Sequence, residues 1–135
     1  MLLQAKIDPK SYQVSLIDLN GGSVSKDDLS AGEKQIFALA MLSALGKTSG
    51  RNLPVMIDTP LGRLDSLHRK KIIDNYFPYA SHQVIILSTD TEVDENYYSQ
   101  LNKHISKAFH LTYNIEHGKS DITNGYFWKN KEVVA

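Results

Sequence analysis

Cysteine is absent from the 135 residues, which excludes disulfides, zinc sites built from thiolates and a cysteine nucleophile. The chain also has no excess charge, since 15 basic and 15 acidic side chains give a formal net charge of zero. That balance argues against a strongly basic surface for nucleic acid. No apolar run approaches the ~18 residues that a membrane helix needs, and no signal peptide opens the chain. We therefore expect a cytoplasmic protein that does not enter a membrane.

The length and composition that remain are those of one globular domain. The hydrophobic fraction is 41% and the charged fraction is 22%, which is ordinary globular usage and argues against intrinsic disorder. A chain of this length can bury a core without disulfides or a structural metal. We expect residues 1–135 to form a single unit.

The order of the predicted elements favours the α/β class. The middle of the chain alternates helix, strand, helix and strand, which favours parallel pairing. The apolar runs at 53–57 and 84–87 are continuous, as in central strands that are covered on both faces. The pattern predicts strands at 2–7 and 12–19, a helix at 31–45, a strand at 53–57, a helix at 66–76, a strand at 84–87, a helix at 94–105, and a hairpin of 107–115 and 121–127 around His117-Gly118.

Both apolar runs end in polar segments that contain acids. Asp58 follows the first run and Asp90 the second. Because the carboxyl ends of parallel strands meet at one edge, where open α/β sheets bind their ligands, we expect both acids on the rim of a binding site. From its position alone, Asp58 at a strand end could equally cap a turn. Asp65 could be the N-cap of the next helix.

The string LSAGEKQ opens the longest predicted helix and allows two interpretations. Ser30 and Glu33 match a capping box, with Ser30 as the N-cap. The following IFALAMLSAL is apolar nearly all round, which predicts a buried helix. The same residues also suit a phosphate, because a helix N terminus offers free N–H groups, Gly32 allows close approach and Ser30 carries a hydroxyl. Both interpretations remain open at this point.

Four segments, in this order, resemble the nucleotide-binding parts of ABC-type ATPases. LSAGE resembles the signature motif, LPVMID the Walker B strand, Leu64-Asp65 the D-loop, and VIILSTD the strand and switch segment that follow. The longer strings LSAGEKQIFALAML, LPVMIDTPLGRLDSLHR and SHQVIILSTDTE are similar to the DndD-like family, which are SMC-like ATPases of bacterial DNA sulfur modification (phosphorothioation). The resemblance runs from about residue 3 to the end.

The resemblance implies the C-terminal lobe of an ABC/SMC-type P-loop NTPase head. Such a lobe has a mostly parallel central sheet with flanking helices and terminal antiparallel hairpins. Its cofactors are ATP and Mg²⁺, with Asp58 holding the metal, usually through water. The implied nucleotide-binding residues are Leu29, Ser30, Ala31, Gly32 and Glu33, of which Ser30 and Gly32 contact a γ-phosphate on a second, opposing head. The implied catalytic residues are Asp58, Thr59, Asp65, Thr89, Asp90 and Glu92.

Two of these positions depart from the usual ABC pattern. Thr59 stands where the family usually has a catalytic glutamate, and a threonine cannot act as a carboxylate base. Thr89 stands where the switch histidine is usual, and it cannot carry a positive charge to a γ-phosphate. Either hydrolysis is weak or another group orients the water. Asp65, Asp90 and Glu92 are the candidates, and we hypothesise that Asp90 or Glu92 compensates.

The chain has no phosphate-binding P-loop. Gly46-Lys47-Thr48 lacks the first glycine of G-x-x-x-x-G-K-[ST], because residue 41 is a methionine. We expect Gly46 instead to end the long helix in the left-handed conformation, with Lys47 near the negative helix end. The resemblance places the Walker A motif in an N-terminal half of the same protein, so we expect the chain alone to be inactive.

The resemblance also implies partners and leaves alternatives open. The partners are the N-terminal half, a second head that joins on ATP binding, other DNA sulfur-modification proteins, and DNA in the full complex. The first hypothesis is an ATPase half-domain of a DndD-like protein that supports DNA phosphorothioation. The alternatives are an ATP-gated DNA clamp with little hydrolysis, and the head half-domain of another SMC-like ATPase in DNA repair.

Overall fold

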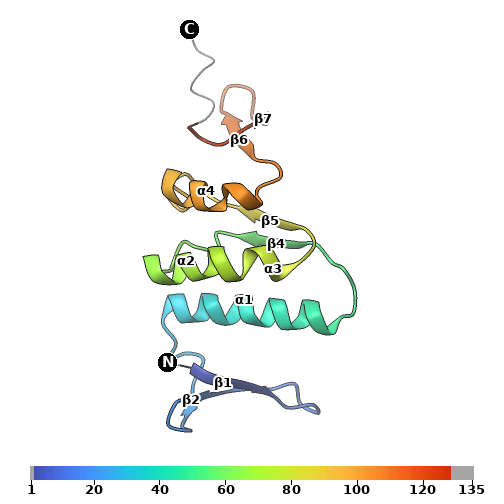
Figure 1. Ribbon diagram of the computed structural model, residues 1–135, viewed down its shortest axis with the longest axis vertical. Helices are drawn as coiled ribbons and strands as arrows, with labels where there is room; N and C mark the ends of the chain where they lie inside the picture. Colours follow the sequence, from blue (N-terminus) through green and yellow to red (C-terminus); the bar gives the residue numbers. More distant parts are fainter. Residues whose placement is uncertain (1, 129–135) are drawn as a thin grey trace.

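The computed structural model describes residues 2–128, in which the elements form successive layers from an N-terminal sheet to a C-terminal hairpin (Figure 1). The elements are β1 (Leu2–Ile7), β2 (Val14–Asp18), β3 (Ser23–Val24), α1 (Ala31–Thr48), β4 (Val55–Asp58), α2 (Ser66–Asn75), α3 (Phe77–Ala80), β5 (Val84–Leu87), α4 (Glu95–Leu101), a 3₁₀ helix (Asn102–His104), β6 (Phe109–Asn114) and β7 (Lys119–Asn124). None of the helices in this range is long and apolar enough to cross a membrane. The order of the predicted elements is confirmed, and β3 and α3 are additions.

The strands form three separate sheets within the described residues. β1, β2 and β3 pair antiparallel, β4 and β5 pair parallel, and β6 and β7 form an antiparallel hairpin. The α/β class and the parallel pairing of the two apolar runs are therefore confirmed. A mostly parallel central sheet is not present, because only two of the strands run parallel.

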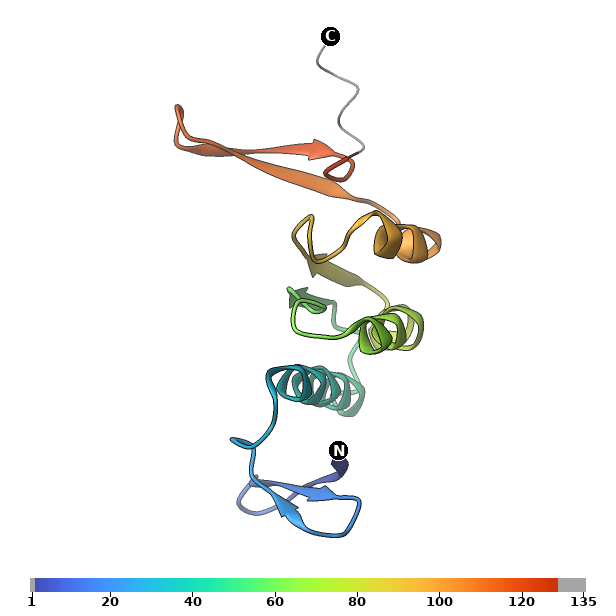
Figure 2. The ribbon, with the colours of Figure 1, turned by 90° about the vertical axis from the view of Figure 1, so that its left-hand side faces the viewer.

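The core lies on one side of β4 and β5, where α2, α3 and α4 are found (Figure 2). Partners in a parallel pair point to the same side, and Val55, Ile57, Val84 and Ile86 point into this core. On the opposite side Met56 is 63% exposed. The expectation that these strands are covered on both faces is thus wrong for this chain, because the described residues supply helices to one face.

The expectation of a buried α1 is also wrong. Only Leu39 of this helix is buried, and Leu45 is 60% exposed. The apolar side chains lie all round the helix, whereas the rest of the described chain packs against one side of it. α1 also continues past Gly46, so the expected stop there is wrong. The left-handed glycine after this helix is Gly50, with φ of 63°, and Lys47 lies in the last turn as expected.

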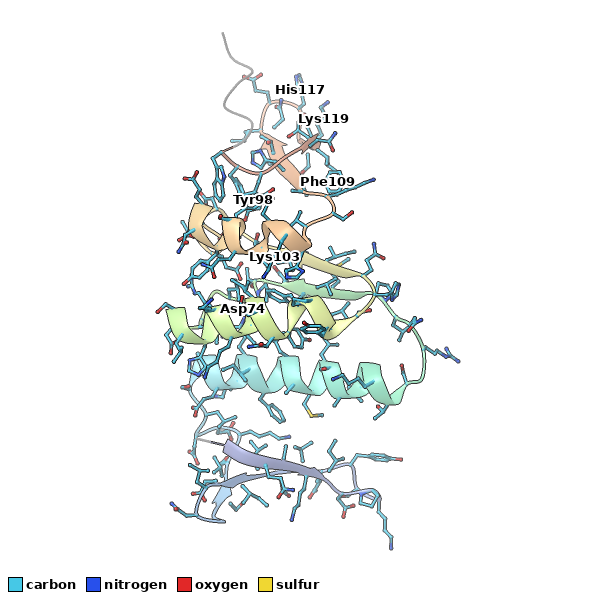
Figure 3. The ribbon with its side chains drawn as sticks, in the orientation of Figure 1. Asp74, Tyr98, Lys103, Phe109, His117 and Lys119 are labelled. Carbon is cyan, nitrogen blue, oxygen red and sulfur yellow. The ribbon has the colours of Figure 1, made fainter. Side chains whose placement is uncertain are left out.

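Aromatic side chains connect α4, on which Figure 3 labels Tyr98, to the segment after the C-terminal hairpin. The ring of Tyr98 lies 4.8 Å from that of Tyr126 and 5.6 Å from that of Trp128, measured between centroids. One face of the hairpin itself is apolar and open. It carries the exposed side chains Phe109, Leu111, Tyr113 and Ile122.

Candidate functional site

The predicted site segments gather at the carboxyl edge of β4 and β5. The two strands are in register there, with Asp58 opposite Leu87, and the Thr59 N–H donates to the Leu87 carbonyl at 2.9 Å. The chain turns back from this edge into α2 and α4, and α1 also begins on this side (Figure 1). Asp58 and the segment with Asp90 therefore lie on one rim, as the strand pattern predicts.

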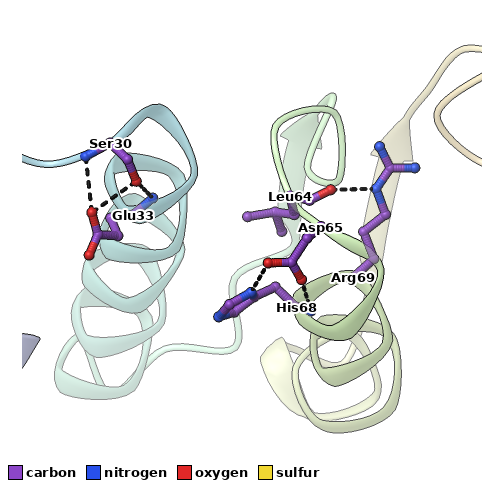
Figure 4. A network of polar contacts seen from close by, with 6 residues as sticks. All are labelled: Ser30, Glu33, Leu64, Asp65, His68 and Arg69. Atoms are coloured by element: carbon purple, nitrogen blue, oxygen red, sulfur yellow. Dashed lines mark hydrogen bonds and ion pairs between the residues drawn. The ribbon is translucent and has the colours of Figure 1, made fainter. Parts of the chain in front are cut away.

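The start of α1 is a complete capping box (Figure 4). The Ser30 hydroxyl accepts the Glu33 N–H at 3.3 Å, and the Glu33 carboxylate accepts the Ser30 N–H at 3.0 Å. The Ser30 hydroxyl also donates to that carboxylate at 2.8 Å. These bonds, first the one from the Ser30 N–H, lower the pKa of the Glu33 carboxyl. The capping interpretation is confirmed, and phosphate binding at Ser30 stays a prediction.

The first turn of α1 lies directly against the segment that resembles a D-loop. A Cβ atom placed on Gly32 would come within 2.9 Å of the Arg63 carbonyl oxygen and 3.6 Å of the Leu64 side chain. No side chain fits against a backbone oxygen at that distance. Glycine at position 32 therefore has a packing role within the chain, in addition to any role toward a phosphate.

The variant Gly32→Ala is expected to be less stable than the wild type by about 1–3 kcal/mol, because the added methyl forces backbone to move. Gly46→Ala is the matched control. Nothing lies within 4 Å of a Cβ at that position. Gly46 lies in the last turn of α1, where replacing a helical glycine by alanine should stabilise by up to about 0.5–1 kcal/mol. Chemical denaturation of the 135-residue chain measures both, and equal stability of Gly32→Ala and wild type would contradict the packing role.

Asp65 caps α2, as one of its two interpretations predicts. Its carboxylate accepts the His68 N–H at 2.9 Å and lies 2.7 Å from the His68 ring Nδ1 (Figure 4). These bonds, first the one from the His68 backbone, lower the pKa of Asp65. One turn further, Arg69 Nε donates to the Leu64 carbonyl at 2.9 Å and fixes the end of the preceding loop.

Thr59, at the position of the usual catalytic glutamate, has a strained backbone. Its φ is 45°, a left-handed conformation that is a genuine outlier for a β-branched residue. The turn directs its carbonyl toward α1, where Gln35 Nε2 donates to it at 2.8 Å. Gln35 thus ties α1 to the end of β4. Sequence reasoning missed this residue, since no side-chain pattern predicts the turn of Thr59.

The segment after β5 forms a hydrogen-bonded turn. The Thr89 hydroxyl accepts the Glu92 N–H at 3.2 Å, and the Thr89 carbonyl accepts the Val93 N–H at 3.2 Å. The Tyr126 hydroxyl donates to the Thr89 carbonyl at 3.3 Å. The hydroxyl of Thr89 is therefore engaged within the turn, whereas Asp90 is exposed on the rim.

Glu92 points inward and is the one charged side chain buried among residues 2–128, with 4% exposure. One carboxylate oxygen accepts the N–H of Leu61, and the other is buried without a partner. Burial raises the pKa of this carboxyl, while the bonds from Leu61 and Thr89 and the charge of Arg69 oppose the rise. Of the predicted catalytic residues, Glu92 is thus the one withdrawn from solvent.

The raised pKa of Glu92 predicts a pH dependence of stability. The folded chain binds the proton more tightly than the unfolded chain, whose glutamates titrate near 4.3. The contribution of this group to the free energy of unfolding is therefore complete below that pH, and it is lost as the pH rises toward the folded-state pKa. Glu92→Gln removes this loss, so its stability relative to wild type should increase between pH 4 and pH 7. Denaturation at the two pH values checks this, and a constant difference contradicts it.

Asp58 fits a magnesium ion that arrives with a nucleotide. The ion commonly takes one or two carboxylates and completes its shell with water and phosphate oxygens. Asp58 is exposed at the strand end and can serve as such a ligand. No group of three or more His, Asp or Glu side chains in the described part of the chain could hold a metal by itself.

A groove leads from this edge along α1. It has a volume of about 570 Å³ and is lined by side chains that include Gln35, Leu42, Asp58, Thr59 and Arg63. A second depression of about 550 Å³ continues it along α1 from Leu42.

Two comparisons with known proteins identified no similar protein. The scan against protein-family models finds no match, and the search of curated proteins finds no significant similarity.

Proposed function

We propose that this chain is the C-terminal half of the ATPase head of a DndD-like, SMC-like protein. It would work with an N-terminal half that carries the Walker A motif and would serve DNA phosphorothioation. The observation that carries the proposal is the meeting of the four motif segments at one edge. Gly32 touches Arg63, Gln35 holds Thr59, and the Thr59 N–H bonds to the last residue of β5.

The uncovered surfaces support a missing half. An isolated parallel pair is unusual, because parallel sheets are normally covered on both faces. The depressions along α1 and β4 are lined by apolar side chains, which include Leu42, Leu45, Leu53, Met56 and Tyr79. Exposed apolar patches of this kind mark interaction sites. An N-terminal lobe that adds strands to β4 and β5 and packs on α1 would bury them.

In the proposed mechanism the chain supplies one metal ligand and one phosphate-binding edge. Asp58 would help to place magnesium on ATP held by the N-terminal half of the same head, and the metal would neutralise developing phosphate charge. Ser30, the Gly32 backbone and the positive end of α1 would bind the γ-phosphate of ATP on an opposing head. ATP would thereby join two heads, and hydrolysis would release them.

The water-orienting group needs a carboxylate near the rim, because Thr59 cannot supply one. Asp90 is exposed in the turn after β5 and suits this role. Asp65 is engaged as a helix cap. Thr59 and Thr89 also keep a second function open, namely an ATP-gated clamp on DNA that hydrolyses slowly. The head of another SMC-like DNA-repair ATPase would use the same edge.

Deletion of the gene in a host whose DNA carries phosphorothioate tests the first function. Loss of the modification, restored by the wild-type gene and not by an Asp58→Ala copy, is the expected result. Unchanged modification after deletion would contradict a role in sulfur modification and favour the DNA-repair alternative.

A further inference from the structure

Two loops at the candidate site are fastened to each other by Glu92. The first is residues 59–65, between β4 and α2, and the second is residues 88–94, between β5 and α4. Glu92 lies in the second loop, and its carboxylate accepts the N–H of Leu61 in the first. The two residues are 31 positions apart in the chain. Leu61 is itself fully buried, so water does not replace this bond.

Arg69 makes a second connection between the same loops. Its Nε donates to the Leu64 carbonyl at 2.9 Å, and its Nη1 donates to the Glu92 carbonyl at 3.4 Å. The guanidinium also lies 5.5 Å from the centre of the Tyr97 ring. The side chain therefore spans the junction from α2, and its charge favours the ionised form of Glu92.

We propose that Glu92 is a positioning residue that holds these two loops as one unit, and not the base that activates water. The residue is 4% exposed, and its carboxylate already accepts the Leu61 N–H, so it does not reach the rim. Through Leu61 it would fix Thr59 on one side and Asp65 on the other. The inference deepens the proposed ATPase function, and the measurement of turnover described below depends on that function. The contact between Glu92 and Leu61 is tested by a measurement that needs no ATPase activity.

Three substitutions distinguish the effect of side-chain length from the effect of charge. Glu92→Gln keeps the length of the side chain and an accepting oxygen at its end, and it loses the charge. Glu92→Asp keeps the charge and is shorter by one methylene, so it no longer reaches the Leu61 N–H. Glu92→Ala loses both. Glu116→Ala, in the exposed turn of the C-terminal hairpin, is the control.

The first measurement is hydrogen exchange of the Leu61 amide in the 135-residue chain. We expect Glu92→Gln and Glu116→Ala to keep the protection of wild type. Glu92→Asp and Glu92→Ala should exchange about tenfold faster or more, because the buried N–H loses its acceptor. If Glu92→Ala fails to fold, Glu92→Asp carries the test. Wild-type protection in the Asp or Ala variant would overturn the proposal.

The second measurement is ATP turnover after the chain is joined to an N-terminal half. A positioning role predicts that Glu92→Gln retains turnover within about threefold, and that Glu92→Asp and Glu92→Ala lose about tenfold or more. A Gln variant that keeps the Leu61 protection and loses turnover would overturn the proposal, since the carboxylate would then act chemically. If the joined wild-type protein shows no turnover, the ATPase function fails, and hydrogen exchange alone decides the loop connection.

Discussion

Asp58→Ala is expected to lower ATP turnover by about 100-fold or more in a protein that joins this chain to the proposed N-terminal half. A magnesium ion supplies several kcal/mol of charge stabilisation in phosphoryl transfer, and tenfold in rate corresponds to about 1.4 kcal/mol. Asp58 is exposed at the end of β4, and no contact in the described core depends on its side chain. The variant should therefore fold as wild type does.

A matched aspartate makes the test specific. Asp121 lies exposed in β7 and pairs with Lys119 at 3.3 Å, on the hairpin. An exposed ion pair of this kind contributes little to stability, so Asp121→Ala should retain turnover within about twofold. Equal turnover of Asp58→Ala and wild type would remove Asp58 from the metal site.

Ser30→Ala is expected to abolish ATP-driven association of two heads while ATP binding to each head remains. In the proposed arrangement the Ser30 hydroxyl turns from the Glu33 carboxylate, to which it donates at 2.8 Å, and donates instead to a phosphate held by the opposing head. A hydrogen bond to a charged group contributes about 1.5–3 kcal/mol, which corresponds to about 10- to 100-fold in affinity at each site. Light scattering with and without ATP measures the association, and nucleotide titration measures the binding.

The substitution also removes a helix cap, which by itself costs about 0.5–2 kcal/mol of stability. Asp94→Ala controls for that cost, because the Asp94 side chain caps α4 by accepting the Tyr97 N–H at 2.9 Å. Asp94→Ala should lose similar stability and still associate. Association of Ser30→Ala at wild-type ATP concentrations, or equal failure of both variants, would contradict the role of Ser30.

Local rules were sufficient for the helix starts and the parallel pair. The spacing of Ser30 and Glu33 predicts the capping box, and Asp65 follows the same rule. The continuous run before Leu87 predicts a strand beside β4, and the register places Asp58 at the shared edge. The helix caps depend on neighbours in the sequence, and the parallel pairing follows from the alternation of helix and strand, which is why spacing and element order predict them.

Features that depend on distant parts of the chain could not be predicted in this way. The left-handed Thr59 contradicts the preference of its residue type, and Gln35 becomes important only because that turn directs a carbonyl at it. The sequence placed Glu92 among the candidates for orienting water at the rim, yet tertiary packing buries it against Leu61. The apolar pattern of α1 predicts burial, whereas residues 2–128 provide packing partners for one side of this helix only.

The central claim is that this chain is half of a split ATPase head. ATP hydrolysis by the chain alone and by the chain joined to the proposed N-terminal half tests it most directly. The account predicts no hydrolysis alone and ATP-dependent turnover when joined, with loss of turnover in Asp58→Ala. Absence of both ATP binding and hydrolysis in the joined protein would contradict the account. ATP binding without hydrolysis would retain the split head but favour the clamp, with Thr59 and Thr89 as the reason.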